Sequence, residues 1–265
     1  MEKFSLRDKV IIVTGGTGVL GKVFVDAIAE SGGTVGILGR NAQIANARSK
    51  EITDAGGRAF PLIADVLNET ELLEAKDIVL HRYGKIDGLV NAAGGISGEG
   101  TLSPEQNLFN LNLNAVKQEM DVNLWGTIIP TQVFGSAMVE TVDYGSIVNI
   151  SSMNSKRAIT GMLGYNLGKS GVDCFNQWFA IEVAGRYGDR IRMNAIAPGF
   201  FMTSQNRELH QKPGGGYTER AERVIKQTPF KRYGQPEELQ GALIWLLSDA
   251  SRFVTGAMIC VDGGF

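Results

Sequence analysis

Short apolar runs and longer amphipathic segments alternate along the whole chain. The apolar runs predict strands at residues 9–14, 34–38, 58–63, 86–91, 144–151, 190–195 and 258–261. The segments with helical spacing predict helices at about residues 19–31, 42–55, 69–83, 104–140, 163–187 and 236–247. Strands that are apolar throughout and separated by helices are typical of a parallel sheet covered on both faces. We therefore expect a doubly wound α/β fold with helices on both faces, built as one catalytic domain over residues 1–265.

One segment departs from this alternation. After Pro198 the chain runs to Tyr217 with three consecutive glycines, residues 214–216, and no clear periodicity. A long irregular segment in a compact domain is usually functional. Because this segment follows the carboxyl end of a predicted strand, where open α/β sheets bind ligands, residues 198–217 are expected to form a lid over the substrate.

Composition narrows the function classes. The 265 residues include 26 Lys and Arg and 28 Asp and Glu, a net charge of −2, so nothing favours nucleic acid or an anionic membrane as a partner. The first residues contain no apolar signal core, and no apolar run approaches the roughly 20 residues that span a bilayer. Cys174 and Cys260 lack disulfide or metal-ligand spacing and are expected to be buried free thiols. The sequence thus favours a cytoplasmic protein with no metal site.

A glycine-rich segment joins the first predicted strand to the first predicted helix. Gly16, Gly18 and Gly21 have the G-x-G-x-x-G spacing. Glycine at these positions permits a tight turn, lets a pyrophosphate approach the backbone and packs the helix on the strand. The helix N-terminus then offers unpaired N–H groups to the phosphates. A turn without a ligand is the alternative, but the position directly after the first strand favours a dinucleotide site.

The end of the second predicted strand bears on the choice between NAD and NADP. NAD-binding proteins place an acidic residue about 20 residues past the glycines, for the ribose 2′-hydroxyl. Residues 36–41 contain no acid and end in Arg40 and Asn41. Since an Arg can pair with a 2′-phosphate, the sequence predicts a preference for NADP, with NAD as the alternative cofactor. A solvated loop Arg is the other interpretation. Asp65, after the third strand, could accept a hydrogen bond from the adenine amino group.

Tyr165 and Lys169 lie four residues apart in a predicted helix, so both project from one face. A free tyrosine has a pKa near ~10, and a neighbouring ammonium lowers that pKa. Ser152 follows a predicted strand and could hold a carbonyl oxygen while Tyr165 protonates it. A surface Tyr–Lys pair would explain the spacing alone. With Ser152 included, the pattern predicts a hydride-transfer active site.

These features together resemble the classical short-chain dehydrogenase/reductase family over residues 9–265. The motifs that carry the resemblance are the glycine-rich turn, Asn91-Ala92-Ala93-Gly94, Asn123, Ser152, Tyr165 with Lys169, Pro198-Gly199 with Thr203, and residues 261–264. The family implies a Rossmann fold with a seven-stranded parallel sheet, a nicotinamide cofactor and assembly as a homotetramer. Val19 stands where the family usually has a glycine, and this departure concerns only the phosphate contacts.

The resemblance also implies roles for the catalytic residues. Tyr165 would donate and accept the proton, and Ser152 would anchor the carbonyl or alkoxide oxygen. Lys169 would bind the nicotinamide ribose and lower the pKa of Tyr165. Asn123 would hold a water molecule that links Lys169 to solvent.

Cofactor contacts follow from the same resemblance. Ile196 and Thr203 would hold the nicotinamide carboxamide. The residues expected to contact the cofactor are Gly15, Thr17, Gly18, Val19, Leu20, Gly21, Arg40, Asn41, Asp65, Val66, Asn91, Ala92, Ala93, Gly94, Tyr165, Lys169, Pro198, Gly199, Phe200 and Thr203.

Within the family, residues 131–135, 149–154 and 194–201, followed by 205–207, resemble the D-mannonate oxidoreductase (fructuronate reductase) subgroup, which interconverts D-fructuronate and D-mannonate. Such a sugar acid needs groups that bind a carboxylate and several hydroxyls, and an Arg suits the carboxylate. The expected substrate-binding residues are Ser152, Asn154, Tyr165, Gln205 and Arg207. Alternatives are a reductase of 5-ketogluconate, of another ketose or of a β-ketoacyl thioester. A non-catalytic NADP-binding regulator is a further alternative, which the intact catalytic set argues against.

Overall fold

The computed structural model describes residues 2–103, 105–157, 161–203, 210–212 and 214–265. Seven parallel strands form one sheet in the order β3-β2-β1-β4-β5-β6-β7. The strands are β1 (Val10–Thr14), β2 (Thr34–Gly39), β3 (Arg58–Ile63), β4 (Gly88–Asn91), β5 (Gly145–Ile150), β6 (Ile191–Pro198) and β7 (Met258–Val261). This sheet confirms the predicted fold class.

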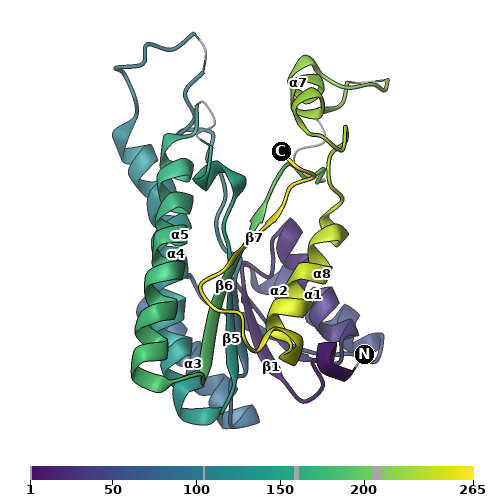
Figure 1. The fold of residues 1–265 in the computed structure, drawn as a ribbon, viewed down its shortest axis with the longest axis vertical. Helices are drawn as coiled ribbons and strands as arrows, with labels where there is room; N and C mark the ends of the chain where they lie inside the picture. Colours follow the sequence, from purple (N-terminus) through teal and green to yellow (C-terminus); the bar gives the residue numbers. More distant parts are fainter. Residues whose placement is uncertain (1, 104, 158–160, 204–209, 213) are drawn as a thin grey trace.

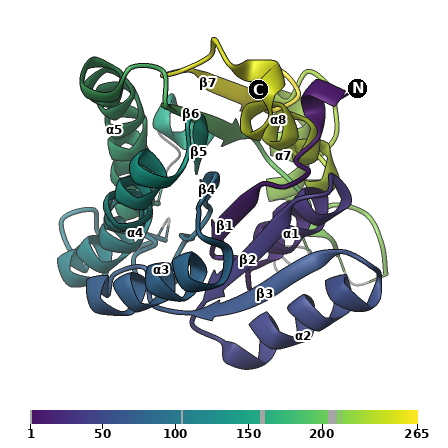
Figure 2. The ribbon, with the colours of Figure 1, turned by 90° about the horizontal axis from the view of Figure 1, so that it is seen from below.

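Helices cover both faces of the sheet (Figure 2). One face carries α3 (Glu69–Tyr83), α4 (Leu113–Thr141) and α5 (Leu163–Tyr187), and the other carries α1 (Val19–Glu30), α2 (Ala42–Asp54) and α8 (Gln240–Leu247). Each face has its own apolar core: Leu72, Phe134 and Val183 belong to the first, and Phe24 and Leu243 to the second. The fold is doubly wound because helices pack on both faces of the sheet and bury its strands between them.

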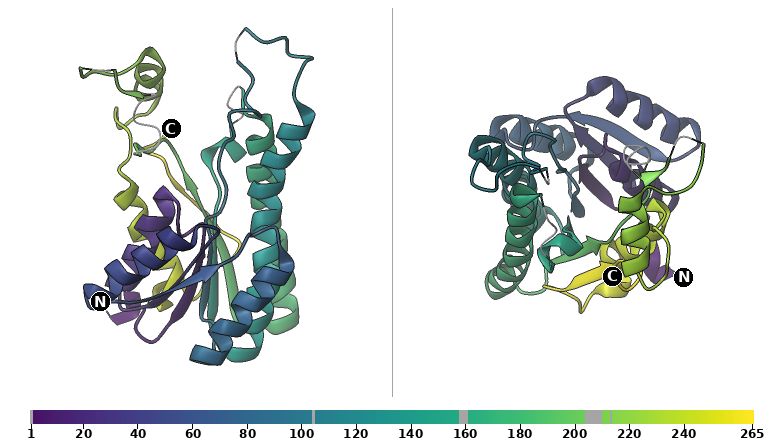
Figure 3. Two further views of the ribbon diagram at one scale, coloured as in Figure 1. Left: turned by 180° about the vertical axis from the view of Figure 1, so that it is seen from behind. Right: turned by 90° about the horizontal axis from the view of Figure 1, so that it is seen from above.

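The strand order reverses between β1 and β4, which are neighbours in the sheet. At such a switch point the connections leave β1 and β4 in opposite directions, and the carboxyl ends of the strands form the usual ligand-binding edge. From this edge rise the segment before α4 on one side and α7 (Glu219–Gln227) on the other (Figures 1 and 3). The fold therefore places the glycine-rich turn and the ends of β4, β5 and β6 together.

Several element boundaries differ from the prediction. Residues 105–112 are not helical, because α4 begins where the Asn112 side chain accepts the Ala115 N–H at 3.2 Å. The predicted helix at 236–247 is a short 3₁₀ turn, Pro236–Leu239, followed by α8. Helix α7, capped by Thr218, lies beyond the expected lid and was not predicted. Of the lid segment itself, the structure describes residues 198–203, 210–212 and 214–217.

The prediction of buried thiols was wrong. Cys174 and Cys260 are both exposed. Cys260 lies on β7, the last strand at one side of the sheet, and all four residues of this strand are partly or fully exposed. None of the helices that the structure describes is both long enough and apolar enough to cross a membrane.

Candidate active site

The glycine-rich turn leaves β1 at the ligand-binding edge and opens into α1. Gly15 has φ +64°, and a Cβ there would lie 2.8 Å from the backbone of Ala92 and Ala93. A Cβ on Gly21 would overlap the Gly15 carbonyl. The N-cap of α1 is Gly18, which has no side chain to occupy the first N–H groups of the helix. The turn therefore fits a pyrophosphate at the N-terminus of α1, as the sequence predicted.

Arg48 of α2 supports this turn from outside, and the sequence analysis missed it. Its guanidinium donates to the Gly18 carbonyl at 2.8 Å and also to the Gly16 carbonyl. Both carbonyls belong to the turn, so one side chain fixes its shape. No motif contains Arg48; its partners are backbone atoms about thirty residues earlier in the chain.

The loop after β4 lies beside the turn. The Thr14 hydroxyl accepts the N–H groups of Ala92 at 3.1 Å and Ala93 at 3.2 Å. The Asn91 side chain is buried and donates to Thr131 and to Asn149, each at 2.9 Å. Asn91 can therefore contact a cofactor only through its backbone, whereas its side chain ties β4 to β5 and α4.

At the end of β2, the two residues expected to contact the adenosine half of the cofactor contact each other. Arg40 Nη1 lies 3.6 Å from Asp65 Oδ2, and the Arg40 side chain is 80% exposed. A Cβ on Gly39 would overlap the Thr17 side chain, so this strand end has no space for an acidic residue. The Asn41 side chain caps α2 by accepting the Ile44 N–H at 3.0 Å.

Ser152, Tyr165 and Lys169 come together at the end of β5. Ser152 lies two residues beyond β5 and is buried, and its Oγ accepts the Asn154 N–H at 3.1 Å. Ser152 and Tyr165 are joined by a side-chain hydrogen bond. Lys169 is buried, and its Nζ donates to the Ile150 carbonyl at 2.8 Å and lies 5.6 Å from the centre of the Tyr165 ring. The structure thus brings the three predicted residues into one cluster.

The electrostatics of this cluster differ from the expectation that Lys169 lowers the pKa of Tyr165. Burial raises the pKa of Tyr165 above its usual value, and the hydrogen bond with Ser152 opposes this effect only in part. Burial also lowers the pKa of Lys169 to about 8, which the Asp173 carboxylate opposes. A desolvated phenol keeps its proton at neutral pH. Tyr165 is therefore an acid in this structure, not a phenolate.

Asp173 lies one turn beyond Lys169 and was not predicted. It is buried and accepts a hydrogen bond from the Ser151 hydroxyl. The i, i+4 spacing from Lys169 was the available signal. Because Asp173 favours the charged form of Lys169, it balances part of the penalty for burying that ammonium.

Asn123 is completely buried in α4. Its Nδ2 donates to the carbonyls of Gly95 and Glu119, each at 2.8 Å, and its Oδ1 accepts the Gly95 N–H at 3.1 Å. The side chain therefore fixes the loop after β4. The role expected for Asn123, holding a water that links Lys169 to solvent, stays a prediction.

The end of β6 carries the remaining predicted cofactor residues. Pro198 ends the strand, and a Cβ on Gly199 would lie 2.7 Å from Asp262. Phe200 packs edge-on against Phe265, with ring centres 5.0 Å apart. The role expected for Ile196 was wrong: its side chain is fully buried in the core, and its carbonyl accepts the Ser151 N–H at 2.8 Å. Neither group can reach a nicotinamide carboxamide.

Only part of the predicted substrate site is described. Asn154 is buried, and its Nδ2 donates to Asn166 Oδ1 at 3.1 Å, beside Tyr165. Gln205 and Arg207 lie outside the described residues. Asn166, the hydrogen-bond partner of Asn154, was not predicted.

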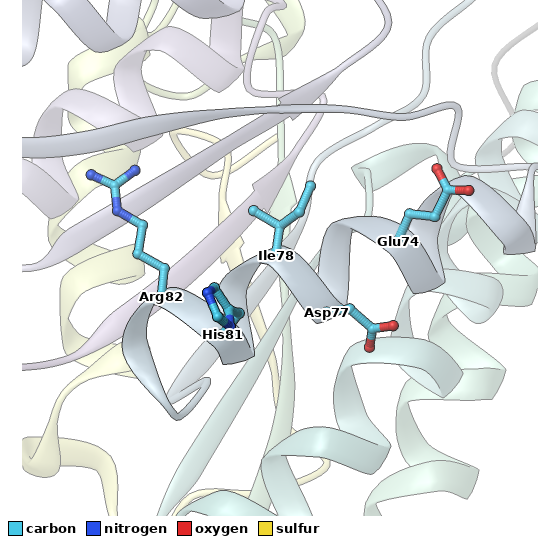
Figure 4. Close-up of a pocket in the computed structure, with 5 residues that line it drawn as sticks. All are labelled: Glu74, Asp77, Ile78, His81 and Arg82. Carbon is cyan, nitrogen blue, oxygen red and sulfur yellow. The ribbon is translucent and has the colours of Figure 1, made fainter.

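A separate surface hollow lies on α3. It is lined by Glu74, Asp77, Ile78, His81 and Arg82 (Figure 4). All five side chains are exposed. None of the predicted site residues lines this hollow, so it lies apart from the candidate active site.

Comparison with known proteins agrees with this geometry. The family model described as enoyl-(acyl carrier protein) reductase matches residues 18–265. The uncharacterised oxidoreductase UxuB of Bacillus subtilis is 37% identical over 270 residues, which cover 98% of this chain and 96% of the relative.

Two solved structures share the whole fold. A candidate D-mannonate oxidoreductase from Haemophilus influenza, with bound NAD, has a TM-score of 0.90 at 33% identity and covers 98% of this chain and 96% of its own. A gluconate 5-dehydrogenase from Burkholderia cenocepacia, in complex with NADP and tartrate, has a TM-score of 0.86 at 31% identity and covers 99% and 96%. The chain belongs to the short-chain dehydrogenase/reductase family and is an NAD(P)-dependent enzyme acting on CH–OH groups.

Proposed function

We propose that the enzyme transfers a hydride between NADP(H) and a sugar acid, with D-fructuronate and D-mannonate as the reacting pair. The observation that carries the reaction is the cluster of Ser152, Tyr165 and Lys169 at the end of β5. The candidate D-mannonate oxidoreductase and the gluconate 5-dehydrogenase, both similar over nearly the whole chain, support a sugar-acid substrate.

Tyr165 is the proton donor of this reaction. Its raised pKa keeps the proton on the phenol at neutral pH, which suits the reduction of a carbonyl. Ser152 shares a hydrogen bond with Tyr165 and donates to the same substrate oxygen, so that oxygen lies within reach of both hydroxyls. The nicotinamide supplies or takes up the hydride when it is bound. Lys169 holds the nicotinamide ribose and, when charged, favours the phenolate left after proton transfer.

The cofactor preference rests on the end of β2. Gly39 leaves no space for the acidic residue that NAD-binding proteins use, because Thr17 fills it. Arg40 is exposed and can leave Asp65 for a 2′-phosphate, since a contact of 3.6 Å between an exposed guanidinium and a half-buried carboxylate is weak. These two features favour NADP, with NAD as the second cofactor.

The polar groups beside Tyr165 suit a polyhydroxylated substrate. Asn154 lies two residues from Ser152 and Asn166 follows Tyr165 in the chain; their amides are hydrogen-bonded to each other, and amides bind sugar hydroxyls as both donors and acceptors. Gln205 and Arg207 complete the proposed substrate site, with Arg207 as the carboxylate ligand.

The test is cofactor oxidation by the purified enzyme with NADPH and with NADH. The substrates are D-fructuronate, D-tagaturonate, 5-keto-D-gluconate, neutral ketoses and a β-ketoacyl thioester. Turnover of D-fructuronate above the others supports the proposal. Turnover of only 5-ketogluconate or the thioester would show that this compound, and not D-fructuronate, is the substrate. The proposed hydride transfer would still stand. NADPH binding without any turnover would favour the regulator.

Self-association as a homotetramer is the proposed assembly. The face of α5 turned away from the sheet exposes Trp178 and Ile181, and α4 beside it exposes Trp125. Large apolar side chains gathered on adjacent helices are typical of an interface between subunits. Light scattering should give the mass of four chains, and Ile181→Asp should lower it. A monomeric wild type would contradict the assembly.

A further inference from the structure

Helix α5 carries Tyr165 but begins without a cap of its own. Its N-cap is Met162, whose side chain has no group that accepts a backbone N–H at this position. The Tyr165 N–H instead donates to Glu119 Oε2 at 3.0 Å. Glu119 belongs to α4, so the first turn of the catalytic helix is capped from a neighbouring helix.

The second oxygen of the same carboxylate has a different partner. Glu119 Oε1 accepts the Ser97 N–H at 2.7 Å, in the segment that follows β4. One turn further along α4, Asn123 holds Gly95 of that segment through both its amide and its carbonyl. One face of α4 therefore joins the loop expected to contact the cofactor to the helix that carries Tyr165.

Two glycines make room for this carboxylate. A Cβ on Gly164 would lie 2.9 Å from Glu119 Oε2 and would overlap the Val116 carbonyl. A Cβ on Gly100 would lie 3.2 Å from the same oxygen. Glu119 itself is only 2% exposed. A buried carboxyl with both oxygens accepting N–H groups is built into the fold and is not a solvated surface charge.

The negative charge of the Glu119 carboxylate also acts on the phenol of Tyr165. The titratable groups that face the phenol are Glu119 from α4 and Lys169 from α5, and the Ser152 hydroxyl contacts it from the end of β5. The negative charge of Glu119 raises the pKa of Tyr165, in the same direction as burial. A negative charge near the N-terminus of α5 is itself favourable, because it complements the helix dipole.

We propose that Glu119 is a positioning residue that holds the backbone of Tyr165, and with it the proton-donating phenol, in place. This inference rests on the proposed role of Tyr165 in proton transfer. Glu119 does not touch the reacting atoms; it acts through the backbone of Tyr165 and through its charge.

The test uses two variants that separate the effect of the length of the Glu119 side chain from the effect of its negative charge. Glu119→Gln keeps the shape and removes the charge, whereas Glu119→Asp keeps the charge and shortens the reach. Both should lower kcat by about tenfold, because small displacements of a proton donor slow the reaction strongly, with cofactor Kd changing less than about twofold. The control is Glu140→Gln, which removes an exposed charge from the same helix and should leave kcat and the pH profile unchanged.

The pH profile of kcat/KM is the measurement that a merely structural role would not move. In Glu119→Gln, the limb of the profile that reports the ionisation of Tyr165 should shift to lower pH, because the phenolate is no longer repelled. In Glu119→Asp the limb should stay near that of the wild type. An unchanged limb in Glu119→Gln, with loss confined to stability, would overturn the proposal.

A gentler variant keeps the test open if Glu119→Gln does not fold. Gly100→Ala crowds Glu119 Oε2 without removing the carboxylate, so kcat should fall by about two- to fivefold in a folded protein. Full activity in that variant would count against the proposal. Tyr165→Phe separates the two claims: a fully active Tyr165→Phe enzyme would refute the role of Tyr165 itself, whichever result Glu119 gives.

Discussion

Lys169 Nζ lies 5.6 Å from the centre of the Tyr165 ring and donates its hydrogen bond not to Tyr165 but to the Ile150 carbonyl, at 2.8 Å. The two side chains are one helical turn apart on α5, as their spacing predicts. Burial is the largest influence on both groups: it raises the pKa of Tyr165 and lowers that of Lys169 to about 8. Tyr165 therefore carries its proton at neutral pH and can donate it to a bound carbonyl.

The depressed pKa of Lys169 predicts a pH-dependent stability. Between about pH 8 and 10.5 the unfolded chain binds a proton that the folded chain has lost, so the free energy of unfolding rises with pH in this window. The Lys169→Met variant has no titrating group at this position, so its free energy of unfolding lacks this pH dependence. Its stability relative to the wild type should therefore be greatest below pH 8 and decline above it, by on the order of 3 kcal/mol at most. Chemical denaturation at a series of pH values measures the difference, and a constant difference across the window would contradict it.

Arg40 should discriminate between the two cofactors. Arg40→Ala removes the guanidinium proposed for the 2′-phosphate, so the Kd of NADPH should rise about tenfold, equivalent to about 1.4 kcal/mol, with that of NADH unchanged. Fluorescence titration measures both constants without turnover. Arg58→Ala is the matched control, because Arg58 is an exposed arginine at the start of β3, at the amino end of a strand and thus opposite the ligand-binding carboxyl ends. An equal rise in the Kd of NADH would show that Arg40 does not recognise the 2′-phosphate.

Arg48 should behave differently from Arg40. It holds the Gly16 and Gly18 carbonyls and therefore the shape of the turn that both cofactors share. Arg48→Ala should raise the Kd of NADH and the Kd of NADPH to the same extent, by about tenfold. The same titrations distinguish the two arginines. A loss confined to NADPH would instead place Arg48 at the 2′-phosphate.

The elements that could be predicted from the sequence are those whose pattern is fixed by burial. β3, α3, α5 and β7 have the predicted bounds, because apolar spacing and flanking turns mark both ends. The segment before α4 was wrongly predicted as helical: Leu108 and Phe109 look like part of an apolar stripe but are exposed, so no core holds them in a helix.

The same distinction holds in the site. Ser152, Tyr165 and Lys169 were predictable because their chemistry depends on spacing within and after one strand and one helix. Glu119 and Arg48 were not, because each acts on backbone atoms of a distant segment, and such contacts leave no sequence spacing. Ile196 was misassigned because a residue inside a strand next to the motif cannot be told from one beyond its end by sequence alone.

The most direct test of the account compares the wild type with Tyr165→Phe in NADPH oxidation by D-fructuronate at neutral pH. The substitution removes one hydroxyl and keeps the ring, so NADPH should still bind with its wild-type Kd. We predict turnover of D-fructuronate by the wild type and a fall in kcat of about a hundredfold or more in the variant, the usual range for loss of a general acid. Comparable turnover by both proteins would contradict the central claim that Tyr165 delivers the proton.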